Sequence, residues 1–122
     1  MSIIPGLIYI SLIGGAILTN NKLNYISVKE ASIQIKKKKF DYILDVRTKE
    51  EYDEGHLPNV ILYESLDKSI VIKDIPNFNS KILIYCRSGN RSKKAGNIMK
   101  KYGYTNIYIV IDGGYAELIK ED

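Results

Sequence analysis

The stretch KILIYCRSGNRSKKAGNIMKKYG, residues 81–103, determines the fold that we expect for this chain. It opens with strand-forming residues at 82–85, and its second half predicts a helix that ends at Gly103. The apolar residues of that second half recur at helical spacing on one face: Ala95, Ile98, Met99 and Tyr102. A glycine-bearing turn joins the two parts and carries Cys86, the one cysteine of the chain. A strand, a tight turn and a helix in this order form the repeating unit of parallel α/β proteins.

The same alternation continues on both sides of this stretch. Short β-rich runs are FDYILDV at 40–46, NVILY at 59–63 and NIYIVI at 106–111. Capping boxes predict helix starts at SVKE, 27–30, and TKEE, 48–51, and a closing helix is expected in GGYAELIKED, 113–122. Strands that alternate with helices indicate a parallel α/β sheet covered on both faces, and 122 residues suffice for one such domain.

The composition is that of a globular protein, with 45% hydrophobic and 26% charged residues, but the charges are unevenly placed. Residues 1–21 carry no charged side chain, residues 41–67 hold eight acids, and residues 80–111 hold seven basic residues and no acid. We interpret the basic block as a field that draws anions toward Cys86. Nucleic-acid binding is not expected, because the block lacks the interleaved aromatic residues and the motifs of such proteins.

Residues 3–19 form an uncharged apolar stretch of 17 residues, which predicts an N-terminal hydrophobic helix. At about 1.5 Å per residue this helix reaches roughly 26 Å, close to the ~30 Å hydrocarbon core of a bilayer. Three interpretations remain open: an uncleaved membrane anchor, which we favour, a cleaved signal peptide, and a buried element of the domain. Gly14-Gly15-Ala16 weakly resembles a cleavage site, but the basic residues that usually begin a signal peptide are absent.

The charges that flank this stretch predict its orientation. No basic residue precedes it, whereas Lys22, Lys29 and Lys36 to Lys39 follow it. By the positive-inside rule, residues 3–19 would cross the membrane once and leave the α/β domain in the cytoplasm. Export after signal cleavage is the alternative.

Cys86 is expected at the carboxyl end of a central strand, where open α/β sheets bind ligands. The N–H groups of the turn, the start of the next helix and the charges of Arg87 and Arg91 all favour a thiolate. Such surroundings lower the pKa of a cysteine from ~8.5 into the range ~3.5–7.5. We therefore expect an ionised nucleophile that meets an anionic substrate. A buried structural cysteine is the alternative, but the glycine, serines and arginines beside it would be poor core neighbours.

Three motifs in order resemble the rhodanese family of sulfurtransferases. YCRSGNRS at 85–92 is similar to the family's active-site loop, LDVRTKEEYDEGHLPNV at 44–60 to its upstream signature, and DGGY at 112–115 to its closing segment. The resemblance implies a rhodanese-like α/β fold with a five-stranded, mainly parallel sheet and helices on both faces, preceded here by the N-terminal hydrophobic helix. The chain would then divide into an anchor or signal segment, residues 1–21, and a rhodanese domain, residues 22–122.

This resemblance also implies an activity, which is sulfane-sulfur transfer by two displacements. The Cys86 thiolate would take the outer sulfur of thiosulfate, release sulfite, and pass the sulfur from its persulfide to cyanide or a thiol acceptor. The loop after the nucleophile would bind the small anionic donor through Arg87, Ser88, Gly89, Asn90, Arg91 and Ser92.

The upstream signature would supply the supporting residues. By resemblance, Asp45 and Arg47 would tie the active loop to the sheet through ion pairs, although a solvated surface pair is another interpretation. Glu51 is assigned only to its capping box, and the Gly-His position of this family gives His56 a structural role. One cysteine and one histidine cannot make a structural zinc site, so no metal and no cofactor are expected.

Two other functions are alternatives to sulfur transfer. Rhodanese-like phosphatases and arsenate reductases place five residues between the cysteine and the arginine, whereas four residues separate Cys86 from Arg91. The shorter loop offers a tighter nest around a sulfur atom. A non-catalytic binding module of this fold usually lacks the cysteine, which this chain retains. The two loop arginines favour a dianion such as thiosulfate over mercaptopyruvate, while persulfide donors would also be attracted.

Overall fold

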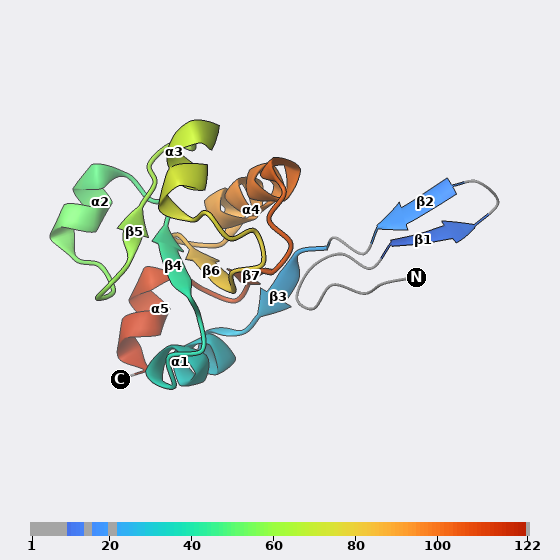
Figure 1. The fold of residues 1–122 in the computed structure, drawn as a ribbon. Helices are drawn as coiled ribbons and strands as arrows, with labels where there is room; N and C mark the ends of the chain where they lie inside the picture. The colour runs from blue at the N-terminus through green and yellow to red at the C-terminus, as the bar shows by residue number, and fades with distance from the viewer. Residues whose placement is uncertain (1–9, 14–15, 20–21, 122) are drawn as a thin grey trace.

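The computed structural model describes residues 10–13, 16–19 and 22–121, and its centre is a sheet of five parallel strands (Figure 1). The strand order across the sheet is β3 (Asn24–Ile26), β7 (Ile107–Val110), β6 (Ile82–Tyr85), β4 (Tyr42–Asp45) and β5 (Ile61–Leu62). Every pair of neighbours in this sheet is parallel. The predicted parallel sheet is thus confirmed, and the strand before Cys86 is central.

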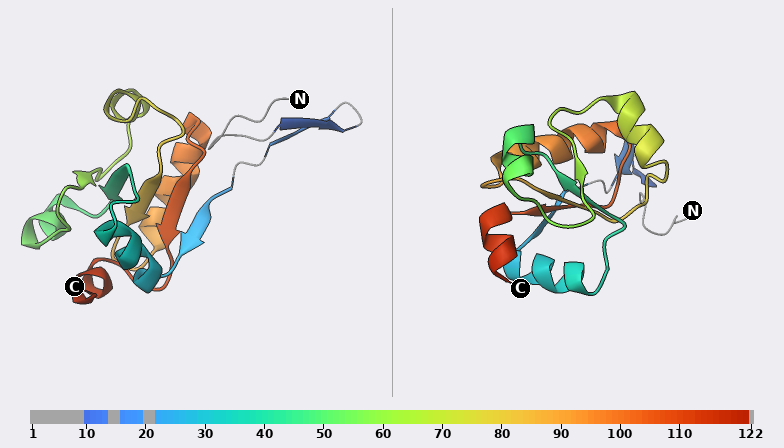
Figure 2. Two further views of the ribbon diagram at one scale, coloured as in Figure 1. Left: turned by 60° about the horizontal axis from the view of Figure 1, so that its bottom comes forward. Right: turned by 90° about the vertical axis from the view of Figure 1, so that its left-hand side faces the viewer.

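Helices cover both faces of the sheet (Figure 2). The side chains of α3 (Lys68–Asp74) and α4 (Asn90–Tyr102) pack on one face, and those of α1 (Val28–Lys36) and α5 (Tyr115–Lys120) on the other. The remaining helix, α2 (Lys49–Glu54), contributes no buried residue.

The strand β6 explains how one sheet supplies two apolar cores. Successive side chains of a strand point to opposite faces. Ile82 and Ile84 therefore join the core under α3 and α4, while Leu83 and Tyr85 join the core under α1 and α5. All four residues are buried, which fixes the register of β6 and the position of Cys86 immediately after it.

The helix ends follow the capping signals in the sequence. Thr48 accepts the N–H of Glu51 at 3.2 Å and the Glu51 carboxylate accepts the N–H of Thr48 at 3.0 Å, so the capping box of α2 is complete. The box of α1 is only half formed: Ser27 accepts the N–H of Glu30, but the Glu30 carboxylate accepts from Gln34 instead. On α4, Ala95 and Met99 are buried as expected, whereas Ile98 lies on the exposed side.

The structure does not support the hydrophobic helix expected over residues 3–19. Ile10–Ile13 and Ala16–Thr19 are the strands β1 and β2, which form a two-stranded antiparallel sheet that pairs Ile10 with Thr19. The isoleucines of this segment are β-branched and favour strands over helices. The rest of the expected helix lies outside the described residues. Among the described helices, none is both long and apolar enough to cross a bilayer.

Candidate active site

Cys86 is the first residue after β6, and the short loop that follows folds back around its sulfur. The backbone N–H groups of Gly89 and Ser92 donate to Cys86 Sγ at 3.0 Å and 3.4 Å. The Ser92 hydroxyl lies 3.5 Å from the same sulfur and donates to the Gly89 carbonyl at 2.9 Å. Gly89 has a φ of +103°, a left-handed conformation that residues with a side chain rarely adopt. The reversal at Gly89 is what aims these donors at Sγ.

Two opposing effects set the pKa of the Cys86 thiol. Burial is the larger single effect and raises this pKa, since only 1% of the residue is exposed. The hydrogen bond between Cys86 and the Ser92 side chain and those from the N–H groups of Ser92, Gly89 and Ser88 together outweigh burial, so the pKa is lowered from its ordinary value. The loop therefore stabilises negative charge on a sulfur that is shielded from water.

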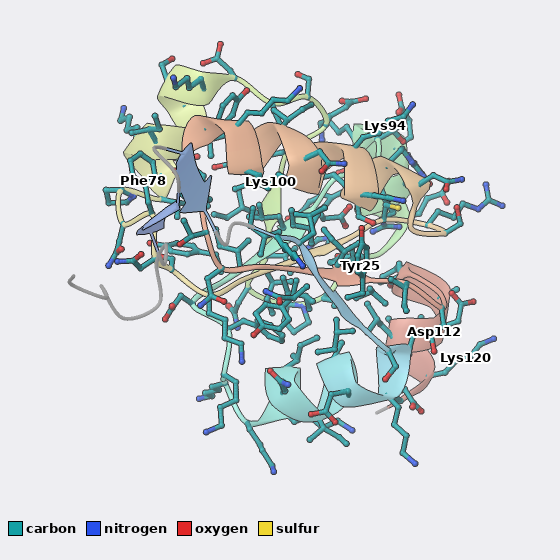
Figure 3. The ribbon with its side chains drawn as sticks, turned by 90° about the vertical axis from the view of Figure 1, so that its right-hand side faces the viewer. Tyr25, Phe78, Lys94, Lys100, Asp112 and Lys120 are labelled. Atoms are coloured by element: carbon teal, nitrogen blue, oxygen red, sulfur yellow. The ribbon has the colours of Figure 1, made fainter. Side chains whose placement is uncertain are left out.

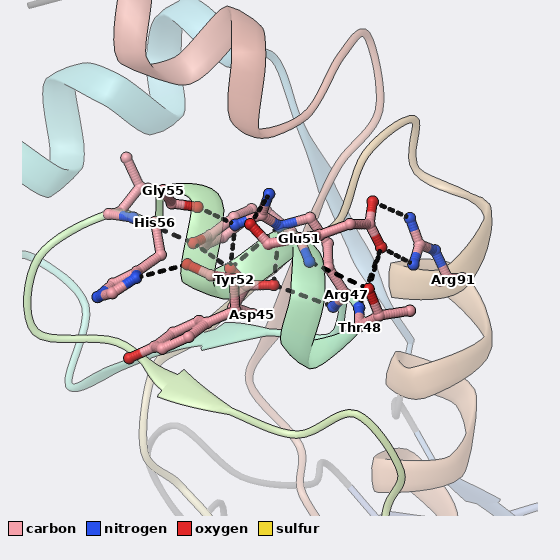
Figure 4. A network of polar contacts seen from close by, with 10 residues as sticks. Asp45, Arg47, Thr48, Glu51, Tyr52, Gly55, His56 and Arg91 are labelled. Carbon is pink, nitrogen blue, oxygen red and sulfur yellow. Dashed lines mark hydrogen bonds and ion pairs between the residues drawn. The ribbon is translucent and has the colours of Figure 1, made fainter.

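Arg91 is bound to Glu51 by two hydrogen bonds in the described structure (Figure 4). Arg91 Nη1 donates to Glu51 Oε1 at 2.6 Å and Nη2 donates to Oε2 at 3.0 Å. The bond to Arg91 is the largest cause that lowers the pKa of Glu51 to about 2, and the N–H and hydroxyl of Thr48 add to it. The pair joins the first turn of α4 to α2, with 40% of the Arg91 side chain and 27% of the Glu51 side chain exposed.

Asp45 and Arg47 form a buried ion pair behind the loop. Arg47 Nη2 lies 2.7 Å from Asp45 Oδ2, and the exposed fractions of the two side chains are 5% and 0%. Asp45 also accepts the Tyr85 hydroxyl at 2.7 Å and the Arg47 N–H at 2.9 Å. Because Tyr85 directly precedes Cys86, the carboxylate at the end of β4 holds the end of β6.

The Arg47 guanidinium also positions the segment that follows α2 (Figure 4). Its Nη2 donates to the Gly55 carbonyl at 2.7 Å, and its Nη1 donates to the Glu51 carbonyl at 3.4 Å. The Tyr115 ring lies against it, with its centroid 4.3 Å from Arg47 Cζ. One buried guanidinium thereby connects β4, α2 and α5.

The closing segment DGGY contacts the active loop through its backbone. The Tyr115 N–H donates to the Cys86 carbonyl at 3.0 Å. A Cβ atom at Gly114 would lie 2.1 Å from the Cys86 carbonyl oxygen, so only glycine fits there. Asp112 accepts the N–H of Val28 at 2.6 Å, which joins the same segment to the start of α1.

A pocket of about 400 Å³ adjoins the loop and is lined by Arg47, Glu51, Glu54, Arg87, Tyr115 and Ala116. Arg87 directly follows Cys86 and its side chain is exposed. In the part of the chain that the structure describes, no ion pair or hydrogen bond occupies the Arg87 guanidinium. Arg87 is thus the cation at this pocket that remains available to an anion.

The profile of the rhodanese-like domain family matches residues 27–121, a span that contains every element from α1 to α5. The chain belongs to this family.

Relatives and solved structures agree with this assignment. The candidate sulfur carrier protein YrkF of Bacillus subtilis is 36% identical over 95 residues, which cover 74% of this chain and 51% of YrkF. A tRNA uridine(34) hydroxylase of Aster yellows witches'-broom phytoplasma is 32% identical over 119 residues, or 90% of this chain and 37% of that protein. The solution structure of hp1203 from Helicobacter pylori is 31% identical, with a TM-score of 0.64 over 80% of this chain and 83% of that one.

Some curated relatives are longer than this chain, and others are named for sulfur transfer. The chain spans about half of YrkF and little more than a third of the phytoplasma hydroxylase. The thiosulfate sulfurtransferase PspE of Escherichia coli is 28% identical over 68 residues, which cover 55% of this chain and 65% of PspE.

The loop residues of this rhodanese-like domain take different positions around the sulfur. Gly89 and Ser92 donate to Sγ, while Ser88 and Asn90 are exposed on the outer side of the loop. That outer side borders a smaller pocket of about 170 Å³, which Tyr25 and Lys93 also line. The basic residues continue from the loop along α4, where Lys94 and Lys100 are visible (Figure 3). The positive field expected from the sequence therefore extends away from Cys86 on this helix.

Two acidic residues have larger roles in the site than the sequence predicts. The sequence assigns Glu51 only to its capping box, yet its carboxylate also binds Arg91, which lies 40 positions further along the chain. Glu54 was given no role, although it lines the pocket beside Arg87. The alternation of strand and helix places α2 beside the active loop. This alternation is the feature of the sequence from which a position near the loop could be predicted for Glu51 and Glu54.

The contacts of His56 in the described structure indicate a structural role. Its Nδ1 lies 2.9 Å from the Tyr52 carbonyl, and its ring stacks on Tyr52 with centroids 3.7 Å apart (Figure 4). No cluster of His, Cys, Asp and Glu side chains suited to a metal occurs among the described residues.

Proposed function

We propose that this domain is a sulfurtransferase that moves a sulfane sulfur through a persulfide on Cys86. The observation that carries the proposal is the nest of N–H groups of Gly89 and Ser92 aimed at Sγ. The names of the relatives YrkF and PspE support sulfur handling, and PspE is named for thiosulfate. Thiosulfate or a related persulfide is the proposed donor, and cyanide or a thiol is the proposed acceptor.

The proposed reaction has two displacements at sulfur. The Cys86 thiolate attacks the outer sulfur of thiosulfate, a new sulfur–sulfur bond forms, and the old one breaks as its electron pair leaves with sulfite. The acceptor then attacks the outer sulfur of the Cys86 persulfide, and the electron pair of that bond returns to Cys86. No external oxidant or reductant is required.

The loop provides the electrostatic stabilisation that each displacement needs. Its N–H groups are fixed by Gly89 and by the start of α4, so they do not reorganise as charge moves between Sγ and the outer sulfur. Arg87 is available to hold the sulfonate oxygens of thiosulfate. Arg91 would take part only when a dianion displaces the Glu51 carboxylate from it.

Phosphate-ester hydrolysis is a weaker proposal for this site. Four residues separate Cys86 from Arg91, one fewer than in the related phosphatases and arsenate reductases. In the structure, the Gly89 and Ser92 N–H groups both lie close enough to donate to the sulfur atom itself. This arrangement favours charge on sulfur over a tetrahedral phosphate.

Intact mass spectrometry tests the proposal directly. Incubation with thiosulfate should add one sulfur atom, about 32 Da, and cyanide should remove it. Cys86→Ser should abolish both changes, while hydrolysis of an aryl phosphate stays at background. Wild-type protein that remains unmodified by thiosulfate and by small persulfides would refute the proposal.

A further inference from the structure

The four charged side chains that line the pocket beside Cys86 differ in whether they have a partner. Arg47 is paired with Asp45, and Glu51 is paired with Arg91. Arg87 and Glu54 also line the pocket, and neither takes part in an ion pair within the described chain. The pocket therefore presents one uncompensated positive charge and one uncompensated negative charge.

We infer that Glu54 and Arg87 select an acceptor thiol that carries both an ammonium and a carboxylate group, as a free amino-acid thiol does. The carboxylate of the acceptor would bind Arg87 and its ammonium would bind Glu54. This inference rests on the proposed sulfur transfer and names the acceptor class that the same site prefers. An acceptor with only negative charge would meet Arg87 but would be repelled by Glu54.

The size and the apolar lining of the pocket agree with such an acceptor. A volume of about 400 Å³ falls within the range of small-molecule sites and leaves room beyond an inorganic anion. Tyr115 and Ala116 add an apolar wall against which the carbon chain of an amino acid could lie.

Glu54 is held in place by its neighbour. It is the last residue of α2, and the carbonyl of the next residue, Gly55, accepts from the buried Arg47 guanidinium at 2.7 Å. Arg87 is likewise positioned by its neighbour, because it follows the buried Cys86. Both charges thus sit on anchored backbone, which reduces the ordering cost of binding a dipolar molecule.

The transfer to this acceptor is balanced without a further reactant. The acceptor thiolate attacks the outer sulfur of the Cys86 persulfide and forms a new sulfur–sulfur bond. The bond from that sulfur to Cys86 Sγ breaks, and its electron pair regenerates the Cys86 thiolate. The product is the persulfide of the amino-acid thiol.

The test compares three acceptors with the persulfide form of the full chain, prepared with thiosulfate and freed of excess donor. Cysteine carries both charged groups, 3-mercaptopropionate carries only the carboxylate, and cysteamine carries only the ammonium. Discharge of the persulfide is followed by intact mass. Each rate in a variant is divided by the wild-type rate with the same acceptor, which cancels the differing reactivities of the three thiols.

Glu54→Gln should slow discharge to cysteine and cysteamine by about two- to fivefold relative to 3-mercaptopropionate, as expected for an exposed ion pair. Arg87→Gln should instead slow cysteine and 3-mercaptopropionate relative to cysteamine. Glu50→Gln is the matched control, since Glu50 is an exposed acid of the same helix that does not line the pocket. It should leave all three ratios at one.

Two outcomes would overturn the inference, and they are distinguishable. Equal effects of Glu54→Gln on all three acceptors, in a protein that still loads sulfur and discharges it to cyanide, would refute the acceptor class alone. A wild-type protein that never takes up sulfur on Cys86 would refute the proposed function together with this inference.

Discussion

Ser92 contacts the Cys86 sulfur and also holds the loop around it in shape. Its N–H donates to Cys86 Sγ, while its hydroxyl oxygen accepts from Sγ and its hydroxyl proton closes the loop by donating to the Gly89 carbonyl. The side chain is fully buried, so no water can replace a lost hydrogen bond. A substitution that removes only the Ser92 hydroxyl should therefore affect the pKa of the Cys86 thiol more than the stability of the fold.

Ser92→Ala should raise the pKa of Cys86, because burial would then be opposed by fewer hydrogen bonds. A hydrogen bond to a charged group contributes ~1.5–3 kcal/mol, so the thiolate fraction at neutral pH should fall by about tenfold or more. The rate of alkylation by iodoacetamide, measured across pH, reports this change. The alkylation rate should begin to rise at a higher pH in the variant than in the wild type.

Ser92→Thr is the matched control for this experiment, since it keeps the hydroxyl and adds only a methyl group. Its alkylation profile should stay close to that of the wild type. An unchanged profile in Ser92→Ala would mean that the backbone N–H groups alone stabilise the thiolate.

Glu51 limits how strongly Arg91 can bind an external dianion. Glu51→Gln keeps a carbonyl oxygen for the Thr48 N–H but removes the charge that holds Arg91. The KM for thiosulfate should therefore fall by about two- to fivefold, the scale of a partly exposed ion pair. Steady-state sulfite release measures it. Asp53→Asn removes an exposed acid from the same helix and should leave KM unchanged; an equal fall there would point to net charge alone.

The same ion pair predicts a pH dependence of stability. The pKa of Glu51 is lowered to about 2 in the folded state from an ordinary value of 4.5. Its stabilising contribution is therefore complete above about pH 4.5 and is lost as the pH falls through about 2. Urea unfolding of wild type and Glu51→Gln should differ by up to ~1 kcal/mol at pH 6, and the difference should shrink as the pH falls and vanish below about pH 2. A difference that stays constant across this range would contradict the assignment.

Among the elements, α2 depends on polar contacts because it contributes no buried residue to either core. The Thr48 capping box, the Arg47 guanidinium and the Arg91–Glu51 pair hold it. These contacts also place Glu51 and Glu54 at the pocket. The position of α2 should therefore be sensitive to single changes among its polar partners.

Arg47→Met should destabilise the domain by ~3–5 kcal/mol, because it leaves the buried Asp45 carboxylate without its charged partner. The Gly55 carbonyl would lose its donor as well. Urea denaturation measures the free energy of unfolding. The double variant Asp45→Asn with Arg47→Met should recover part of the loss, since no charge then remains buried.

Lys49→Ala is the control for the effect of Arg47. Lys49 pairs with Asp53 on the exposed side of α2, where such pairs contribute ~0.2–1 kcal/mol. A cost for Arg47→Met no larger than that of Lys49→Ala would show that the buried pair does not hold α2.

The elements with long periodic signals were predictable from the sequence. The runs at 40–46, 82–85 and 106–111 contain β4, β6 and β7, and α4 ends before Gly103 as expected. Periodicity is most informative for such elements because several side chains face the same core. The parallel order and the place of Cys86 followed from them.

Two short elements were missed for physical reasons. The strand β3 has only three residues, Asn24–Ile26, and gains its ladder by pairing with β7, whose paired residues lie 84 positions further along the chain. The helix α3, Lys68–Asp74, contains Ile70, Val71 and Ile72, a β-branched run that favours a strand. Only Val71 is buried, so tertiary packing overrides the local preference.

At the scale of the whole molecule, the two apolar cores define the domain. Their buried members run from Ile26 to Leu118, and Leu23 packs at the edge of one of them. We therefore propose that residues 22–122 fold as an independent rhodanese-like domain and that residues 1–21 serve another purpose. The uncharged apolar composition of those first residues favours contact with a membrane.

We propose that residues 3–19 attach the protein to a membrane with its catalytic domain in the cytoplasm. The lysines that follow the apolar stretch, Lys22, Lys29 and Lys36 to Lys39, give the positive-inside bias. A cysteine that forms a persulfide also works most readily where thiols stay reduced. Export after signal cleavage is the competing outcome.

Deletion of residues 1–21 tests both proposals in one experiment. The truncated protein should keep its unfolding midpoint and its uptake of sulfur on Cys86, because the described cores lie beyond the deletion. The full chain should sediment with membranes while the truncated protein does not. An impermeant thiol reagent should label Cys86 only after lysis, since the cytoplasmic side is closed to it. A mature N-terminus near Ile17, with Cys86 labelled in intact cells, would refute the anchor and show that the domain is exported.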